Sequence, residues 1–124
     1  MKQLLKKLRG YGITEPREGA RKFRMAGHGV ADFEDIRWYR QPQEHPKLPE
    51  ALQGEIVGWS EFLKPAPGDM VIIPMRSGKK AVWLVQSTEP QSNPRDMYFA
   101  VLAGPFGYEN DPFTDEVREI SFAV

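Results

Sequence analysis

The large apolar residues of this chain gather into short runs separated by turn-forming residues. Three runs, at residues 70–75, 81–85 and 98–103, are rich in β-branched, aromatic and other apolar side chains. Such side chains fit a pleated, buried surface, so the runs predict β-strands. The run at 81–85 is apolar at every position, which is typical of a strand covered on both faces. Periodicity alone also allows a buried helix there, but the β-branched content and a nearby glycine favour the strand.

Two turn-forming segments separate these runs. Residues 65–69 read Pro-Ala-Pro-Gly-Asp, and residues 76–80 read Arg-Ser-Gly-Lys-Lys. Proline fixes φ and glycine readily takes positive φ, so the first segment predicts a sharp corner and the second a hairpin. Pro74 lacks an amide donor, so the strand before the hairpin ends there or lies at a sheet edge. The order of strand, Pro-Gly-Asp corner, strand, Gly-Lys hairpin and strand resembles the first half of an SH3-like or related small barrel.

The predicted fold is therefore mainly β (α+β), a small antiparallel SH3-like or related β-barrel or curled sheet with a short N-terminal helix. The helix would lie at residues 2–9, where Leu4, Leu5 and Leu8 share one face and Gly10 follows. A chain of 124 residues fits one domain. We expect residues 1–26 to form a helical or loop segment packed on a β-rich core at 30–124.

The remaining segments give weaker patterns. Further strands are predicted at 30–41, 55–59 and 119–124. Proline-rich composition predicts a long surface connection at 41–54, with one helical turn at 49–54, and an exposed loop at 87–96. Residues 16–26 fit either a short helix or a strand at 21–26, and we favour the helix.

Composition excludes several classes of function. The chain has no cysteine, which excludes disulfides, thiolate nucleophiles and cysteine-based zinc sites and favours a cytoplasmic location. No apolar segment approaches the ~20 residues of a spanning helix, so no membrane association is expected. The net charge is zero but uneven: residues 1–24 carry eight Lys/Arg and two Asp/Glu, and residues 105–124 carry one Arg and five Asp/Glu. The basic end is expected either to pair with the acidic end or to meet an acidic ligand.

Motifs for catalysis or cofactor binding are largely missing. Residues 77–80 lack the upstream glycine and the Ser or Thr of a phosphate-binding loop, and the Gly-x-Ser-x-Gly motif of a nucleophile elbow does not occur. One candidate metal or acid–base group combines a histidine with nearby carboxylates, namely His28, Asp32, Glu34 and Asp35, with His45 as a further member. Solvated carboxylates beside a glycine turn are the more common arrangement. We therefore assign no catalytic residue, metal or cofactor.

Binding of another macromolecule fits the remaining signals better. Aromatic and cationic side chains stand on predicted loops and strand ends, and such residues dominate binding energy at protein interfaces. We interpret Trp38 and Trp83 as core residues. The leading hypothesis is a non-enzymatic module that binds or inhibits another protein, of the immunity, inhibitor or phage and plasmid accessory type. The alternatives are a nucleic-acid-binding small barrel and a small enzyme using His28. The candidate partner-binding residues are Arg37, Tyr39, Arg40, Arg76, Lys79, Lys80, Arg95, Phe106, Tyr108 and Phe113.

Overall fold

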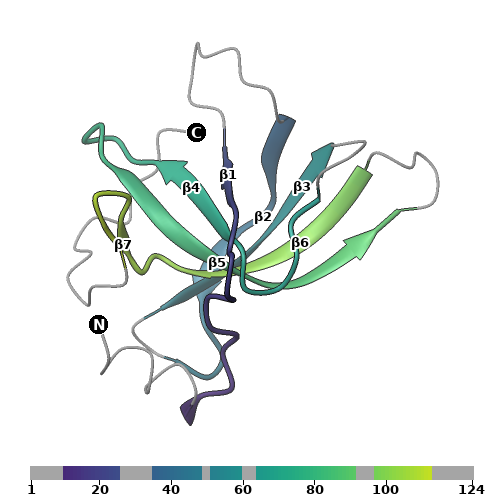
Figure 1. The fold of residues 1–124 in the computed structure, drawn as a ribbon, viewed down its shortest axis with the longest axis horizontal. Coiled ribbons are helices and arrows are strands. Elements are labelled where there is room, and N and C mark those ends of the chain that lie inside the picture. Colours follow the sequence, from purple (N-terminus) through teal and green to yellow (C-terminus); the bar gives the residue numbers. More distant parts are fainter. Residues whose placement is uncertain (1–9, 26–34, 49–50, 60–63, 92–96, 113–124) are drawn as a thin grey trace.

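A computed structural model describes residues 10–25, 35–48, 51–59, 64–91 and 97–112 of the chain. All of its strands belong to one strongly twisted sheet (Figure 1). The strands are β1 (Lys22–Arg24), β2 (Asp35–Glu44), β3 (Leu52–Trp59), β4 (Met70–Pro74), β5 (Lys80–Pro90), β6 (Met97–Gly104), β7 (Gly107–Tyr108) and β8 (Asp111–Pro112). Nowhere in these ranges is there a helix with the length and apolar character needed to cross a bilayer.

The strand order is β1-β4-β5-β6-β3-β2, and β7 joins β5 and β8 beside this path. Every pairing is antiparallel except that of β1 with β4, which is parallel. The mainly β class is therefore confirmed, whereas a wholly antiparallel sheet is wrong. Over the described ranges β1 and β2 do not pair, so the sheet is open. The predicted helix at 2–9 and strand at 119–124 lie outside the described residues.

β5 is the central strand, and both of its faces are buried over residues 81–85. Ala81, Trp83 and Val85 belong to the first core, on the inner side of the sheet, while Val82 and Leu84 belong to the second core, on the other side. The strand prediction and its two-sided burial are confirmed. The first core comprises Phe23, Met25, Ile36, Ile56, Val71, Ile73, Met75, Ala81, Trp83, Val85, Tyr98, Ala100 and Leu102, with Trp38 packed against it. The second comprises Ile13, Leu48, Ala51, Ile72, Val82, Leu84, Ala103 and Phe106.

Both tryptophans take the positions expected of core residues. Trp83 is fully buried, and the partly buried Trp38 meets it edge to face, with ring centroids 5.4 Å apart. Burial of two large aromatic rings in such a pair adds a geometric preference to the hydrophobic gain. The interpretation of Trp38 and Trp83 as core residues is confirmed.

Strands extend into both loops predicted from proline content. β5 continues to Pro90, so an exposed loop beginning at residue 87 is wrong. β2 continues to Glu44 and β3 begins at Leu52, which shortens the expected 41–54 connection and removes the helical turn at 49–54. Pro42 is tolerated because it lies on the outermost strand, at a register shift between Arg40 and Gln43 where no ladder donor is required.

The segment at residues 16–26 contains β1, so the favoured helix is wrong. Phe23 points into the first core, and flanking backbone bonds tie the segment to β4: Met70 N–H donates to Arg21 O, and Met25 N–H donates to Ile72 O. The local sequence favours neither structure strongly. Pairing with a strand nearly fifty residues away along the chain decides the conformation.

The corner at residues 65–69 holds this amino-terminal segment in place through the buried carboxylate of Asp69. Its Oδ1 accepts hydrogen bonds from Arg17 Nε at 2.6 Å and from Arg21 N–H at 3.0 Å. Its Oδ2 accepts from Ala66 N–H at 2.9 Å, closing the turn itself. Burial raises the pKa of Asp69, but hydrogen bonds from Arg17, Arg21 and Ala66 outweigh it, and the pKa lies below its usual value.

Gly68 completes the corner because no other residue fits its surroundings. Its φ is +90°, and a Cβ there would stand 2.8 Å from Cβ of Arg17 and 3.0 Å from the backbone oxygen of Glu15. Its N–H donates to Val85 O, and its carbonyl accepts from Arg17 N–H. The corner is thus hydrogen-bonded to the amino-terminal segment on one side and to β5 on the other.

The cost of crowding at Gly68 can be separated from the cost of its φ. Gly78 has the same φ of +90°, but nothing lies within 4 Å of the position that a Cβ would take there, so it isolates the backbone term. We expect Gly78→Ala to lower the free energy of unfolding by about 1 kcal/mol and Gly68→Ala by about 2–4 kcal/mol. Urea denaturation of both variants measures the difference. Equal losses would show that Arg17 and Glu15 do not crowd the corner.

The Asp69 carboxylate is expected to make stability depend on pH. We expect Asp69→Asn to lower the free energy of unfolding by about 2–3 kcal/mol at pH 7, because the hydrogen bonds to an ionised acceptor are lost. Since the folded-state pKa is lowered, this contribution is complete above the unfolded-state pKa of about 4 and disappears as the pH falls through the folded-state value. Urea denaturation from pH 7 to pH 3 should therefore show a smaller acid loss in Asp69→Asn than in the wild type.

The control for this comparison is Glu18→Gln, which neutralises an exposed carboxylate. It should follow the wild type at every pH. If the free energy of unfolding falls equally in the wild type and in Asp69→Asn as the pH is lowered, the assigned role of Asp69 is contradicted.

Candidate functional site

The outer face of β3 and β6 carries half-buried side chains, in contrast to the inner face. Ile56 of β3 and Tyr98 of β6 point into the first core. The half-buried residues that alternate with the buried ones along each strand point outward. The register places outward Val57 opposite Phe99 and Glu55 opposite Val101. Strand alternation therefore produces a mixed surface of apolar and charged side chains on this face.

A bulge in β2 adds an aromatic and a cation to the same face. The β2–β3 register shifts between Trp38 and Arg40. The ring of Tyr39 meets the ring of Phe99 edge to face at 4.8 Å, and Arg40 Nε lies 3.5 Å from a carboxylate oxygen of Glu55. Both side chains thus reach partners on the outer face, as expected where a bulge interrupts alternation. Tyr39 is 55% exposed, the most exposed of the large apolar side chains described.

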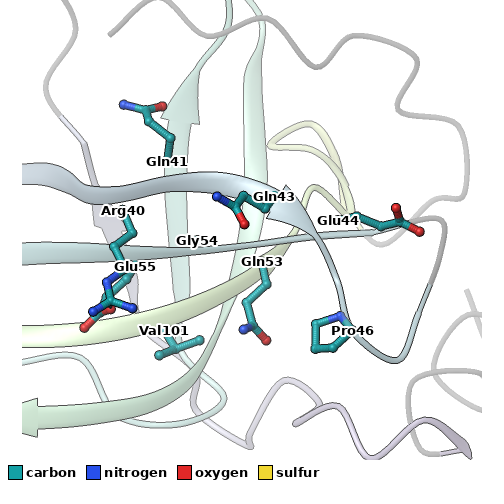
Figure 2. Close-up of a pocket in the computed structure, with 9 residues that line it drawn as sticks. All are labelled: Arg40, Gln41, Gln43, Glu44, Pro46, Gln53, Gly54, Glu55 and Val101. Carbon is teal, nitrogen blue, oxygen red and sulfur yellow. The ribbon is translucent and has the colours of Figure 1, made fainter.

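Two adjoining hollows cross this face and share Glu55 and Val101; we call them together the outer groove. The first, of about 330 Å³, lies along β2 and β3 and ends at Pro46. Figure 2 shows Arg40 and Glu55 side by side on it, with Val101 and Gln53 nearby and Gln41 pointing away from them. The second, of about 280 Å³, continues past Phe99 to residues 87–89 of β5. A register shift between Val85 and Ser87 precedes this part of β5.

The outer groove combines amide groups with an excess of carboxylates. Gln41, Gln43 and Gln53 line its first part, and each amide can donate and accept hydrogen bonds. Its charged lining residues are Arg40, Glu44 and Glu55 in the first hollow and Glu55 and Glu89 in the second, one cation against three carboxylates. The lining therefore suits a polar, cationic ligand that also offers an apolar side chain.

A short turn after β2 forms one end of the groove and is fixed by His45. The buried imidazole accepts hydrogen bonds at Nδ1 from Lys47 N–H at 3.0 Å and from Leu48 N–H at 3.1 Å. Burial, and then the charge of Lys47, lowers the pKa of His45, which favours the neutral ring that can accept these bonds. His45 therefore holds the turn that positions Pro46.

The candidate partner-binding residues divide between two surfaces instead of forming one. Arg37, Tyr39 and Arg40 lie exposed on β2, beside or on the outer groove. The others that lie on the surface are in a separate place, at the turn between β4 and β5 and on β7, beside one another in Figure 1. These are Arg76, Lys79, Lys80 and Tyr108.

Three of the candidate residues do not contribute to either surface as described. Phe106 is only 4% exposed and belongs to the second core, so the described structure offers almost none of its ring to a partner. Its backbone N–H donates to Val82 O, and its ring packs with Val82 and Leu84 of β5 in the second core. Arg95 and Phe113 lie outside the described residues.

The proposed metal or acid–base group receives no support from the geometry. His28, Asp32 and Glu34 lie outside the described residues, and Asp35 is the first residue of β2. Nδ1 of His45 is occupied by two backbone donors. Among the residues that the structure describes, no three His, Asp or Glu side chains gather closely enough to hold a metal ion.

Of the residues that line the outer groove, sequence reasoning names only Arg40. Those it misses include Gln53, Glu55, Phe99 and Val101. The first two fall at a predicted loop end and a predicted strand start, and the other two fall in an apolar run interpreted as core. Alternation about buried Ile56 is the available signal for Glu55. No comparable signal marks Phe99 and Val101, because every residue around them is apolar and only the sheet arrangement shows which face is covered.

Comparison of the chain with protein-family models, curated proteins and solved structures gives no match.

The ion pair between Arg40 and Glu55 is expected to add little to stability. The Arg40 side chain is 75% exposed and the closest separation is 3.5 Å, so solvent screens the attraction. We expect Glu55→Gln to change the free energy of unfolding by less than about 0.5 kcal/mol, measured by urea denaturation. A loss above about 1 kcal/mol would show that Glu55 supports the fold and would remove it from the groove's binding residues.

Proposed function

We propose that this chain is a non-enzymatic binding module whose target is another protein, held in the outer groove. An SH3-like small-barrel form of the whole chain is part of the proposal. It is supported by the curled sheet and by the order of strand, Pro-Gly-Asp corner, strand and hairpin from β3 to β5.

The observation that carries the proposal is the exposed aromatic contact between Tyr39 and Phe99 beside the groove. Tyrosine supplies a large contact area with few rotatable bonds and is enriched among residues that dominate binding energy. A ring that is 55% exposed gains nothing comparable from folding, because most of its surface stays in water. Val57 and Val101 extend the apolar area next to it.

The groove lining favours an extended segment of a protein as the occupant. The amides of Gln43 and Gln53 offer donors and acceptors to the alternating N–H and C=O groups of a peptide backbone. An apolar side chain of the partner would pack on Phe99 and Val101. A lysine or arginine of the partner would balance the carboxylate excess at Glu55 and Glu89.

The test compares two exposed tyrosines. We expect Tyr39→Ser to weaken partner binding by about tenfold or more, because a central aromatic contact is lost. Tyr11→Ser removes the other large exposed apolar side chain, which is 40% exposed and does not line the groove, and should leave binding unchanged. Affinity capture from a nuclease-treated lysate of the source cell, with mass spectrometry, identifies the protein retained by the wild type; calorimetry with that purified protein measures each affinity.

The pattern across the variants decides the outcome. A protein retained by the wild type and by Tyr11→Ser, but lost with Tyr39→Ser and with Val101→Glu, supports the groove. A protein retained equally by all four would overturn it, as would capture that depends on nucleic acid.

A further inference from the structure

A second surface lies at the turn between β4 and β5, next to β7. A hollow of about 560 Å³ there, the hairpin hollow, is lined by Gly78, Lys79, Lys80, Tyr108, Glu109 and Asn110. Backbone bonding builds it: Glu109 N–H donates to Lys80 O, and Tyr108 stands opposite Ala81 in the sheet. The cations and the aromatic ring are therefore held on neighbouring elements rather than on one flexible loop.

Positive charge dominates this surface. Nζ of Lys79 lies 5.0 Å from the centre of the Tyr108 ring. Glu109 is bound through both carboxylate oxygens by Arg24 of β1. The hydrogen bonds from Arg24 lower the pKa of Glu109 in spite of burial, and the charges of Arg24, Lys80 and Lys22 lower it further. Among the side chains that the structure describes here, one carboxylate stands among the four cations Lys22, Arg24, Lys79 and Lys80 and is paired with Arg24, while Asp111 of β8 stands opposite Tyr108 in the sheet.

The arrangement suits a chain of negative charges better than a single small anion. Lys79 and Lys80 are exposed and come from a hairpin, whereas exposed Lys22 comes from β1, so the cations that remain after Arg24 pairs with Glu109 are spread along the surface. A small anion is bound by donors that converge on one point. A phosphodiester backbone instead meets several separated cations in succession.

The ring of Tyr108 distinguishes nucleic acid from an acidic peptide. Aromatic side chains beside cations form stacking platforms for unpaired bases. Tyr108 is half-buried and packs against the first core, and its cation–π contact with exposed Lys79 is weak enough to be exchanged for a base, which would free the ammonium group for a phosphate. Exposed Asn110 adds an amide that can bond base edges.

We propose that the hairpin hollow binds single-stranded nucleic acid, with Lys79 and Lys80 on phosphates and a base on the Tyr108 ring. The site is separate from the outer groove and does not rest on the function proposed for that groove.

The test is fluorescence anisotropy of labelled, mixed-sequence DNA and RNA strands of about 12 nucleotides, titrated with the full chain between about 20 and 200 mM salt. The double variant Lys79→Ala, Lys80→Ala should bind at least about fivefold more weakly at the lowest salt. The slope of log K against log salt should also become shallower by about 1.4, because each lost phosphate contact on a single strand removes about 0.7. Tyr108→Leu should weaken binding about fivefold or more without changing the slope.

Matched controls keep the result specific. Lys47→Ala removes one exposed positive charge away from the hollow and should bind as the wild type does, whereas Lys79→Ala alone should reduce the slope. Tyr39→Ser, beside the outer groove, should also leave nucleic-acid binding unchanged. Absence of binding at the lowest salt, an unchanged slope in the double lysine variant, or equal competition by polyglutamate would each overturn the proposal. Thermal melting confirms that each variant is folded.

Discussion

The carboxylate of Asp69 joins the amino-terminal segment to the corner at residues 65–69, and the placement of β1 depends on it. Arg17 and Arg21 approach from the amino-terminal segment, Ala66 closes the corner, and the corner itself bonds to β5 through Gly68 and Val85. A buried carboxylate is stable only when its hydrogen bonds are satisfied. The side chain therefore forces the segment before β1 to lie against the corner, and the parallel pairing of β1 with β4 follows.

From this corner the chain enters β4 and then β5, whose two buried faces separate the first core from the second. Among the described residues, the second core covers only one end of the outer side, and the middle of β3 and β6 is half-buried on that side. The outer groove occupies this area. Its apolar floor and its charged rim both result from simple strand alternation over a sheet that is covered on one face and partly bare on the other.

The two candidate surfaces differ in chemistry because they belong to different parts of the sheet. The outer groove lies over strand middles and has an excess of carboxylates, while the hairpin hollow gathers lysines at a turn and beside short strands. A single net charge of zero hides this separation. Two candidate surfaces of opposite charge on one chain would allow two different ligands to be held at once without competing for the same side chains.

Local residue chemistry is enough to predict some of the elements. Pro65, Pro67 and Gly68 favour a corner, the β-branched run at 81–85 favours a strand buried on both sides, and Gly78 permits the hairpin. Other features depend on partners that are distant along the chain. Residues 22–24 form a strand because they pair with β4, and Pro42 is acceptable because it lies on an edge strand. Phe106 is buried in the second core, and the arrangement of the sheet leaves the outward side chains of Phe99 and Val101 half-buried. These outcomes depend on contacts between residues tens of positions apart, and such contacts cannot be inferred from a short stretch of sequence alone.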